Sequence, residues 1–516
     1  MSEFTFFWHD YETFGRVPRR DRPAQFAGVR TDAQLNEIGA PLMLYCQPTP
    51  DCLPDPEACL LTGITPQLCR QRGVPEHAFA DAIEAQLAQP GTVGVGYNSI
   101  RFDDEVTRHL FWRNLLDPYA REWQNQCGRW DLLDVVRVTW ALRPEGIQWP
   151  LHEDGKPSFK LEHLTRANGL SHDAAHDALS DVRATIALAR LIKTRQPKLW
   201  DFCLRLRRKD EVVREMGVGK PFLHVSGMYG TERGCMALVW PLAPHPTNKN
   251  EIVVWDLAAD PSELFTLNAE AIRQRMFSKA DELPEGVTRL PIKTIHINKS
   301  PIVIGNLKTL SVDTAAKWGL DVDLAHRHAE LIAKKGNTLA GMWTSVFERP
   351  AQGAVDVDED LYGGFIGNED RRSLQRLRGL SPAQLADKRP ALGKVDVDED
   401  LYGGFIGNED RRSLQRLRAL SPEQLADKRP AFADRRLDEL VFRYRARNFP
   451  ASLNGVEQAQ WQAHCVHRLH DGAGGGQTLE AFFEQIDALQ ESADERGQDI
   501  LGALVDYATE IAPERD

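Results

Sequence analysis

Residues 4–13 read FTFFWHDYET, and this stretch decides the fold of the first part of the chain. The apolar and aromatic run over residues 4–8 is typical of a buried strand. Because residues i and i+2 of a strand face the same side, the carboxylates of Asp10 and Glu12 converge at the end of that run. Two such carboxylates are costly to bring together unless a cation neutralises them, and hard oxygen ligands favour Mg²⁺ or Mn²⁺. A solvated strand end without a metal is the alternative interpretation of this motif alone.

The surrounding residues predict an α/β domain over residues 1–196. Further strands are expected at 38–46 and 93–97, and helices at 104–112, 132–142 and 174–193. Strands that come first and helices that are interleaved later favour a mixed sheet flanked by helices. The last of these helices ends near Gln196-Pro197, where we expect a domain boundary.

Beyond this boundary the sequence pattern changes. Short β-like runs follow at 222–225, 236–240, 252–257 and 294–297, separated by Gly and Pro residues. This pattern predicts a small barrel or sheet domain over residues 197–350. Helical periodicity begins at Asp313 and leads into a helical C-terminal domain over residues 351–516.

The C-terminal part contains a tandem repeat. Residues 355–391 recur at 395–431, and the two copies differ at two positions. Two copies are too few for a solenoid. Each copy predicts an extended segment, a helix around Leu374 and Leu377, and a second helix that starts at Ser381-Pro382. We expect one copy to pack in the domain and the other to loop out, and the sequence alone does not decide which.

The distribution of charge matters more than its sum. The net charge is −12, but residues 480–516 alone carry eleven acidic and two basic residues. Residues 190–209 carry eight Lys or Arg and one Asp. Because counterion release is a local event, this basic stripe keeps DNA and RNA open as partners.

Other classes of protein are excluded by composition. The eight cysteines form no C-x-x-C pair, and no run approaches the ~18 apolar residues of a membrane span. The start, Met1-Ser2-Glu3, lacks the basic flank of a secretory signal. We therefore expect a cytoplasmic protein with reduced thiols, and neither a disulfide scaffold, nor a membrane protein, nor a disordered chain.

Two further motifs carry acidic residues. Residues 97–105 open a helix after a strand, with Asp103 and Asp104 at its start, where acidic residues also simply complement the helix dipole. In residues 168–181 the pattern H-x₄-D occurs twice, as His172/Asp177 and His176/Asp181. A capped amphipathic helix is the alternative interpretation there.

Taken together, the three motifs carry a resemblance. A D-x-E motif, then N-x₃-F-D, then H-x₄-D, in one α/β domain, is the order of the DEDDh exonucleases, and the chain resembles the bacterial exodeoxyribonuclease I family. The resemblance extends over nearly the whole chain and includes residues 96–120, 129–150, 158–170, 175–197, 224–230, 296–303 and 440–450. The duplicated repeat and the longer acidic C-terminus depart from the family.

This resemblance implies a ribonuclease H-like domain, an SH3-like β-barrel and a helical domain that form a C-shaped molecule around single-stranded DNA. It implies a Mg²⁺-dependent 3′→5′ exonuclease that releases 5′-mononucleotides, with Mn²⁺ as a possible substitute. The matched catalytic residues are Asp10, Glu12, Asp103, His176 and Asp181, of which all but His176 would hold two metal ions. His176 would be the general base. His172, Asp104 and Asp177 become neighbours rather than ligands.

The matched segments also imply contacts to DNA and to a protein partner. The DNA contacts would come from Glu12, Arg108, Tyr119, Trp123, Arg137 and Lys160, with His296 or Lys299 as further candidates. Family members can carry Arg where Lys160 stands, and Lys loses the bidentate fork. The family also binds the acidic C-terminal tail of single-stranded DNA-binding protein, for which Arg143 and Phe202 would serve. Core packing is the alternative role for each aromatic residue.

We therefore expect a monomeric exonuclease of single-stranded DNA that serves repair and recombination. A DEDDh exonuclease acting on RNA, or a proofreading subunit, is the rival enzyme. A non-catalytic DNA-binding or scaffold protein is the rival from another class, if the duplication disables the channel.

Overall fold

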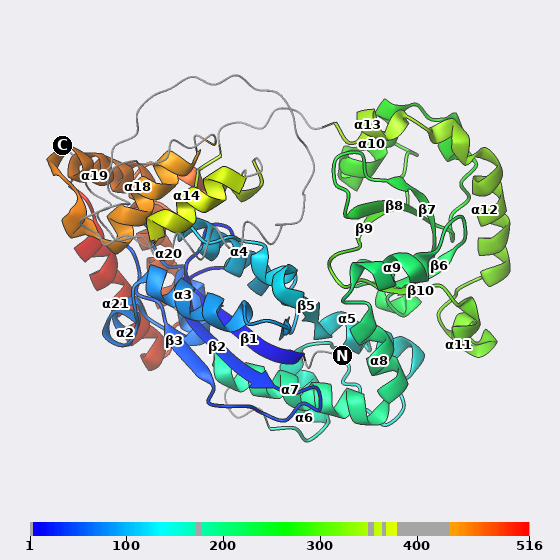
Figure 1. Ribbon diagram of the computed structural model, residues 1–516, viewed down its shortest axis with the longest axis horizontal. Helices are drawn as coiled ribbons and strands as arrows, with labels where there is room; N and C mark the ends of the chain where they lie inside the picture. Colours follow the sequence, from blue (N-terminus) through cyan, green and yellow to red (C-terminus); the bar gives the residue numbers. More distant parts are fainter. Residues whose placement is uncertain are drawn as a thin grey trace.

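The structure is a computed structural model that describes residues 4–171, 177–348, 355–363, 368–378, 434 and 436–514. The chain forms an N-terminal region, a middle region and a C-terminal region. In Figure 1 the middle and C-terminal regions lie on opposite sides of the N-terminal region.

A five-stranded mixed sheet forms the centre of the N-terminal region, in the order β3-β2-β1-β4-β5. Its strands are β1 (Thr5–Thr13), β2 (Pro23–Thr31), β3 (Leu42–Tyr45), β4 (Thr92–Gly96) and β5 (Gly128–Asp131). β1 pairs antiparallel with β2 and parallel with β4. The predicted mixed sheet is confirmed.

Helices cover both faces of this sheet. They are α1 (Pro56–Thr62), α2 (Pro66–Arg72), α3 (Glu76–Leu87), α4 (Asp103–Arg113), α5 (Leu132–Leu142), α6 (Leu161–Ala167) and α7 (Ala178–Arg195). Because side chains alternate along a strand, Phe6 and Trp8 of β1 pack in the core that contains α5 and α7, whereas Phe7 packs with α3 and α4. Each face of β1 is therefore buried by a different pair of helices.

One predicted strand is shorter than expected, since β3 covers only Leu42–Tyr45 of the range 38–46, and the strands β2 and β5 were missed. β1 continues beyond the apolar run to Thr13, because its pairing with β2 extends as far as Thr13 and sets Glu12 opposite Gln25. The D-x-E motif lies at the end of this strand, as predicted. β2 itself was not predicted, since Gly28 interrupts its pattern; a Cβ there would lie 2.3 Å from the ring of Phe7.

The middle region is an open antiparallel sheet in the order β10-β6-β7-β8-β9. Its strands are β6 (Phe222–Val225), β7 (Met236–Pro244), β8 (Glu251–Asp256), β9 (Ile292–His296) and β10 (Ile302–Ile304). Its helices are α8 (Pro197–Arg205), α9 (Lys209–Met216), α10 (Ala269–Phe277), α11 (Val312–Lys317), α12 (Val322–Lys335) and α13 (Met342–Val346). The four predicted β-like runs all overlap strands, and β10 was not predicted.

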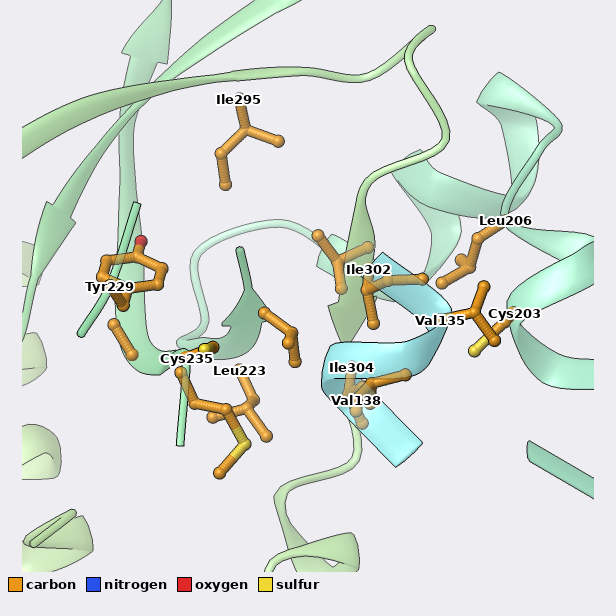
Figure 2. Packing of buried hydrophobic residues seen from close by; sticks show 14 of the residues in the cluster. Val135, Val138, Cys203, Leu206, Leu223, Tyr229, Cys235, Ile295, Ile302 and Ile304 are labelled. Carbon is orange, nitrogen blue, oxygen red and sulfur yellow. The ribbon is translucent and has the colours of Figure 1, made fainter. Parts of the chain in front are cut away.

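The N-terminal and middle regions share one hydrophobic core. Figure 2 shows Val135 and Val138 of α5 beside Ile302 and Ile304 of β10, and all four are buried in the same cluster. Burying a side chain of this size contributes about 1.5–3 kcal/mol. The two regions are therefore held as one body by apolar packing.

The C-terminal region is helical, as predicted. It contains α14 (Asn368–Arg378), α18 (Arg436–Asn448), α19 (Gly455–Leu469), α20 (Leu479–Gln490) and α21 (Glu495–Ile511). The acidic C-terminal segment forms α20 and α21, which bury Phe482 and Leu504 against α1 and α2. The acidic side chains of this segment are therefore carried by folded helices.

The first repeat copy packs in this region. Leu374 and Leu377 of α14 are buried in a cluster with Trp112 of α4 and Leu440 of α18. The helix expected around Leu374 is thus present. The helix expected at Ser381-Pro382, and the whole second copy at 395–431, lie outside the described residues.

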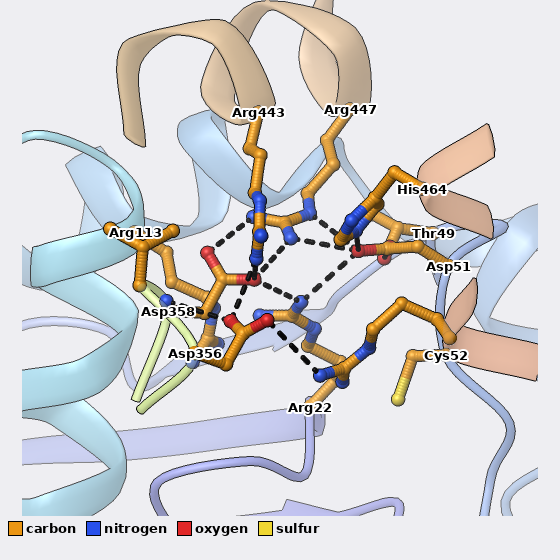
Figure 3. A network of polar contacts seen from close by, with 12 residues as sticks. Arg22, Thr49, Asp51, Cys52, Arg113, Asp356, Asp358, Arg443, Arg447 and His464 are labelled. Atoms are coloured by element: carbon orange, nitrogen blue, oxygen red, sulfur yellow. Dashed lines mark hydrogen bonds and ion pairs between the residues drawn. The ribbon is translucent and has the colours of Figure 1, made fainter. Parts of the chain in front are cut away.

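A buried network of ion pairs joins the first repeat copy to the N-terminal region (Figure 3). Arg447 of α18 donates from Nη2 to Asp51 Oδ2 at 2.7 Å and from Nη1 to Asp358 Oδ1 at 3.0 Å. Arg443 bridges Asp356 and Asp358 at 2.7 and 3.2 Å. We call these five residues, with Arg22, the inter-region network.

The remaining sequence expectations concern thiols and membranes. All eight cysteines are free thiols and seven are buried. Within the described ranges, no helix combines the length and the apolar character that crossing a membrane requires.

Candidate active site

β1 carries the first two acidic residues of the site. Asp10 and Glu12 lie two positions apart on this strand and face the same side. One carboxylate oxygen of each lies within 4.8 Å of a carboxylate oxygen of Asp181. Opposite ligands of an octahedral Mg²⁺ are about 4.2 Å apart, twice the usual Mg–O distance. The spacing of the three carboxylates therefore fits a divalent cation.

α7 brings Asp181 to this point. The helix begins at Ala178, later than the predicted residue 174, because Asp177 has an extended backbone and caps the helix by accepting from the Ser180 amide at 3.1 Å. The amide of Ala178 donates to Gln25 Oε1 on β2 at 3.2 Å. Since Gln25 lies opposite Glu12 in the sheet, this bond holds the first turn of α7 beside the D-x-E motif.

α4 brings Asp103 to the same strand. The amide of Tyr11, between Asp10 and Glu12, donates to Asp103 Oδ1 at 3.1 Å. Thr107, one turn further along α4, donates to the Asp103 carbonyl at 2.8 Å and lies 3.0 Å from the Tyr11 hydroxyl. Tyr11, Thr107 and Gln25 were not identified from the sequence, because their roles arise from contacts between distant segments.

The carboxyls of the cluster have raised pKa values. Burial, reinforced by Asp103 and Glu12, raises the pKa of Asp10 well above its usual value. Burial, and to a lesser extent the Asp181 carboxylate, raise the pKa of Glu12 to about 8. Burial, and to a lesser extent the Asp104 carboxylate, raise the pKa of Asp103 to about 8. Asp103, Glu12 and Asp181 all raise the pKa of Asp10, and a bound cation would neutralise such a cluster.

The predicted general base cannot be placed. His176 and the alternative His172 lie outside the described residues, whereas Asp177 and Asp181 lie inside them. Four of the five predicted catalytic residues are therefore brought together on β1, α4 and α7.

The predicted DNA contacts fall into an exposed group and a group that is buried or half-buried. Trp123 is 53% exposed, and Lys160 is exposed at the start of α6. Arg108 is buried, donates to Glu122 and Glu105 at 2.7 Å each, and lies 5.2 Å from the centre of the Tyr119 ring. Arg137 pairs with Asp134 at 2.5 Å. Only the first group presents its side chain openly to solvent.

The residues expected to bind a partner tail lie on the N-terminal and middle regions. Arg143 is exposed just after α5. Phe202 of α8 is half-buried, with the guanidinium of Arg205 5.6 Å from its ring centre.

The two further candidates for DNA contact, His296 and Lys299, lie beside acidic residues. His296 lies 3.2 Å from Glu251, and Lys299 lies 3.8 Å from Glu105.

Comparison with known proteins covers all three regions. The family model described as "Exonuclease" matches residues 7–189, that of the exonuclease I SH3-like domain matches 207–349, and that of the exonuclease I C-terminal domain matches 355–393 and 395–511. The exodeoxyribonuclease I of Escherichia coli is 40% identical over 515 residues, covering 99% of this chain and 98% of the relative. That of Haemophilus influenzae is 43% identical over 478 residues, covering 92% of each. This chain belongs to the exodeoxyribonuclease I family.

Solved structures of family members agree with this assignment. Exonuclease I from Methylocaldum szegediense aligns with a TM-score of 0.86 at 46% identity, covering 98% of this chain and 99% of that one. Escherichia coli exonuclease I in complex with a dA16 oligonucleotide aligns with a TM-score of 0.85 at 39% identity, covering 99% and 100%. The expectation of a single-strand-specific 3′→5′ DNA exonuclease of the DEDD type is confirmed, and the acidic site implies a metal ion.

Proposed function

We propose that this exodeoxyribonuclease I uses Mg²⁺ to hydrolyse single-stranded DNA to 5′-mononucleotides, as a cytoplasmic monomer in DNA repair and recombination. We also propose that its domains divide at residues 1–196, 197–350 and 351–516. The observation that carries the catalytic proposal is the convergence of Asp10, Glu12 and Asp181 within 4.8 Å, with Asp103 held to the same strand by Tyr11.

The acidic residues would hold two metal ions. Asp10, Glu12 and Asp181 would bind the first, Asp10 would also touch the second, and Asp103 would reach the second through water. When bound, the ions supply a hydroxide and stabilise the leaving 3′-oxygen of the phosphodiester. Mn²⁺, another hard cation, would substitute for Mg²⁺.

His176 would act as the general base that takes the proton of the attacking water. The assignment follows from the H-x₄-D spacing to Asp181 and from the family resemblance. His176→Ala should lower turnover by about a hundredfold or more while DNA binding stays measurable. Turnover close to that of the unaltered protein would exclude this role.

DNA would be held by stacking and by backbone neutralisation. Trp123 and Tyr119 would stack on bases, and Lys160, Arg137 and Arg108 would face phosphates, with Glu12 touching the terminal nucleotide. Trp123 and Lys160 are exposed, which supports their proposed contacts with DNA. Arg108 would contribute once DNA replaces one of its two glutamate partners.

The decisive test incubates the purified protein with labelled single-stranded DNA, duplex DNA or RNA, in Mg²⁺ or EDTA. Mg²⁺-dependent release of mononucleotides from 3′ ends of single-stranded DNA alone is the expected result. Binding without turnover would overturn the enzyme proposal, and comparable release from RNA would overturn the proposed substrate.

A protein partner is proposed on the outer surface. Arg143 and Phe202 would receive the acidic C-terminal tail of single-stranded DNA-binding protein, through charge and an apolar contact respectively. Arg143→Glu should abolish stimulation by that protein and leave hydrolysis of naked DNA unchanged. Arg72→Glu, which alters an exposed arginine on α2, is the matched control and should leave the stimulation intact.

A further inference from the structure

The first turn of α4 contacts all three regions of the molecule. Each of its three consecutive acidic residues contacts a different part of the structure. Asp103 faces β1 and the proposed metal site. Glu105 lies 3.8 Å from Lys299 of the middle region and accepts a hydrogen bond from Tyr362 of the first repeat copy. Asp104, between them, is 1% exposed and faces the interior of the N-terminal region.

Two arginines hold Asp104. Arg121 Nη2 donates to Oδ1 at 2.6 Å, and Arg129 Nη1 donates to Oδ2 at 3.1 Å. Burial alone would raise the pKa of Asp104, yet these guanidiniums hold it below its usual value. Both arginine side chains are almost completely buried. Each arginine gives one charge-assisted hydrogen bond to a different oxygen of the carboxylate, and Arg129 also pairs with Glu122 at 3.2 Å.

Arg129 also reaches the middle region. Its Nη2 lies 3.5 Å from the Asn298 carbonyl oxygen, and its own carbonyl oxygen accepts a hydrogen bond from Ser300 Oγ at 3.0 Å. Asn298 and Ser300 belong to the turn between β9 and β10, where Ser300 has a φ of 49°. Such a conformation in a residue other than glycine persists only where surrounding contacts maintain it.

The start of α4 has no side-chain cap. Its N-cap residue is Phe102, which offers no side-chain hydrogen bond to the first turn. The Asp104 side chain instead ties this turn to Arg121 and Arg129 in the interior of the N-terminal region. Because adjacent Cα atoms are joined at about 3.8 Å, any shift of Asp104 moves Asp103 with it.

We propose that Arg129 is a positioning residue that fixes the metal ligand Asp103 through Asp104 and links it to the 298–300 turn of the SH3-like region. The proposal rests on the metal site proposed above. It means that the affinity of the site for its cation depends on a segment of the middle region. Arg129 itself touches neither metal nor DNA in this account.

The test compares three conservative variants. Arg129→Lys keeps the charge but loses the planar guanidinium that reaches Asp104, Glu122 and Asn298 at once, and Arg121 still neutralises Asp104, so the variant should fold. Ser300→Ala removes only the hydroxyl that reaches the Arg129 carbonyl. Arg113→Lys is the matched control, because Arg113 is as buried as Arg129 and lies on α4, the helix of Asp103, but pairs with Glu76 at 2.8 Å at the far end of that helix.

Mn²⁺ binding is measured by calorimetry without DNA, and the Mg²⁺ concentration for half-maximal hydrolysis is measured beside the KM for DNA. Arg129→Lys should weaken Mn²⁺ binding and raise the Mg²⁺ requirement by about tenfold each, with the KM unchanged. Ser300→Ala should shift both by about threefold, since a single hydrogen bond is lost. Arg113→Lys should lower the unfolding temperature without either shift.

The outcomes separate this inference from the metal site itself. If the unaltered protein binds no Mn²⁺, or if Asp181→Asn binds it equally well, the proposed metal site is wrong. If the unaltered protein binds Mn²⁺ and Asp181→Asn does not, normal binding by Arg129→Lys overturns the positioning role alone. Equal losses of Mn²⁺ affinity in Arg129→Lys and Arg113→Lys would also overturn the positioning role. Normal Mn²⁺ affinity in Ser300→Ala would show that the SH3-like region has no part in it.

Discussion

Two buried acidic clusters of this molecule differ in what neutralises them. In the inter-region network, burial opposes ionisation of Asp51 and Asp358, but Arg447 and its neighbours hold both pKa values well below the usual range. In the active site, burial is reinforced by other carboxylates, and the pKa values of Asp10 and Glu12 rise. The fully buried carboxyls of the network, which face arginines, and the half-buried carboxyls of the active site, which face other carboxylates, therefore have pKa values shifted in opposite directions.

The difference identifies which cluster is structural and which is functional. A buried charge is tolerated only when it is paired. The network obtains its pairing from the chain itself, and among the described residues no lysine or arginine forms an ion pair with Asp10, Glu12 or Asp103. A site that collects negative charge without a protein cation is suited to an external one.

The largest effect is expected from removing a metal ligand. Asp181→Asn should lower hydrolysis of single-stranded DNA by at least about a hundredfold, because even residues that only support metal ligands typically contribute 10–100-fold. The unfolding temperature in EDTA should stay the same or rise, since one source of repulsion on Glu12 is removed. Asp177→Asn is the control, because asparagine also caps helices and activity should survive. If Asp181→Asn lowered the unfolding temperature but left hydrolysis unchanged, Asp181 would be a structural residue rather than a metal ligand.

The opposite pattern is expected in the network. Asp358→Asn leaves Arg447, Arg443 and Arg22 without one of their buried partners, which should weaken docking of the C-terminal region by about 3–5 kcal/mol. Urea midpoints and limited proteolysis would measure this, and hydrolysis per folded molecule should change little. Asp360→Asn, in the same segment, removes a looser pair at 3.4 Å and should cost less than about 1 kcal/mol. Equal effects of the two variants would contradict this account.

The same contrast explains what could be predicted from sequence. The helix at 132–142 and the strand at 222–225 were placed at their observed bounds, because each is a continuous local pattern. The D-x-E motif was recognised at the end of the first strand, but β2 was not predicted, so the strand pairing that extends β1 to Thr13 was not foreseen. The network joins residues 22, 51, 358 and 447, and no local pattern links positions so far apart.

A smaller effect is expected from pH in the absence of metal. Glu12 and Asp103 have folded pKa values of about 8, above their ordinary values of 4.5 and 3.8. Their contribution to stability is therefore full below about pH 4 and is lost as pH rises through about 8. The network carboxyls, with lowered pKa values, contribute constantly over this range. The unfolding temperature in EDTA should fall between about pH 5 and pH 8.

Bound Mg²⁺ should remove that fall, because the cation replaces the protons that the folded site otherwise retains. The gap between unfolding temperatures in Mg²⁺ and in EDTA should therefore widen with pH. Glu12→Gln removes one of the two raised pKa values and should make the decline in EDTA shallower. A gap that is constant with pH would contradict the assignment of these carboxyls to the metal site.

The smallest effect is expected from shortening the repeat. Deleting residues 394–433 removes one 40-residue period and joins Gly393 to Asp434. The described contacts of the network and of α14 are made by the first copy and by α18, so they stay in the shortened chain. The unfolding temperature and the hydrolysis rate should match those of the full chain. Deleting residues 354–393 instead leaves the second copy, which keeps Val397, Asp398, Leu414 and Leu417 at the positions equivalent to Val357, Asp358, Leu374 and Leu377, and should give the same result. A large loss in only one of the two deletions would mean that the copies are not equivalent, despite differing at only two positions.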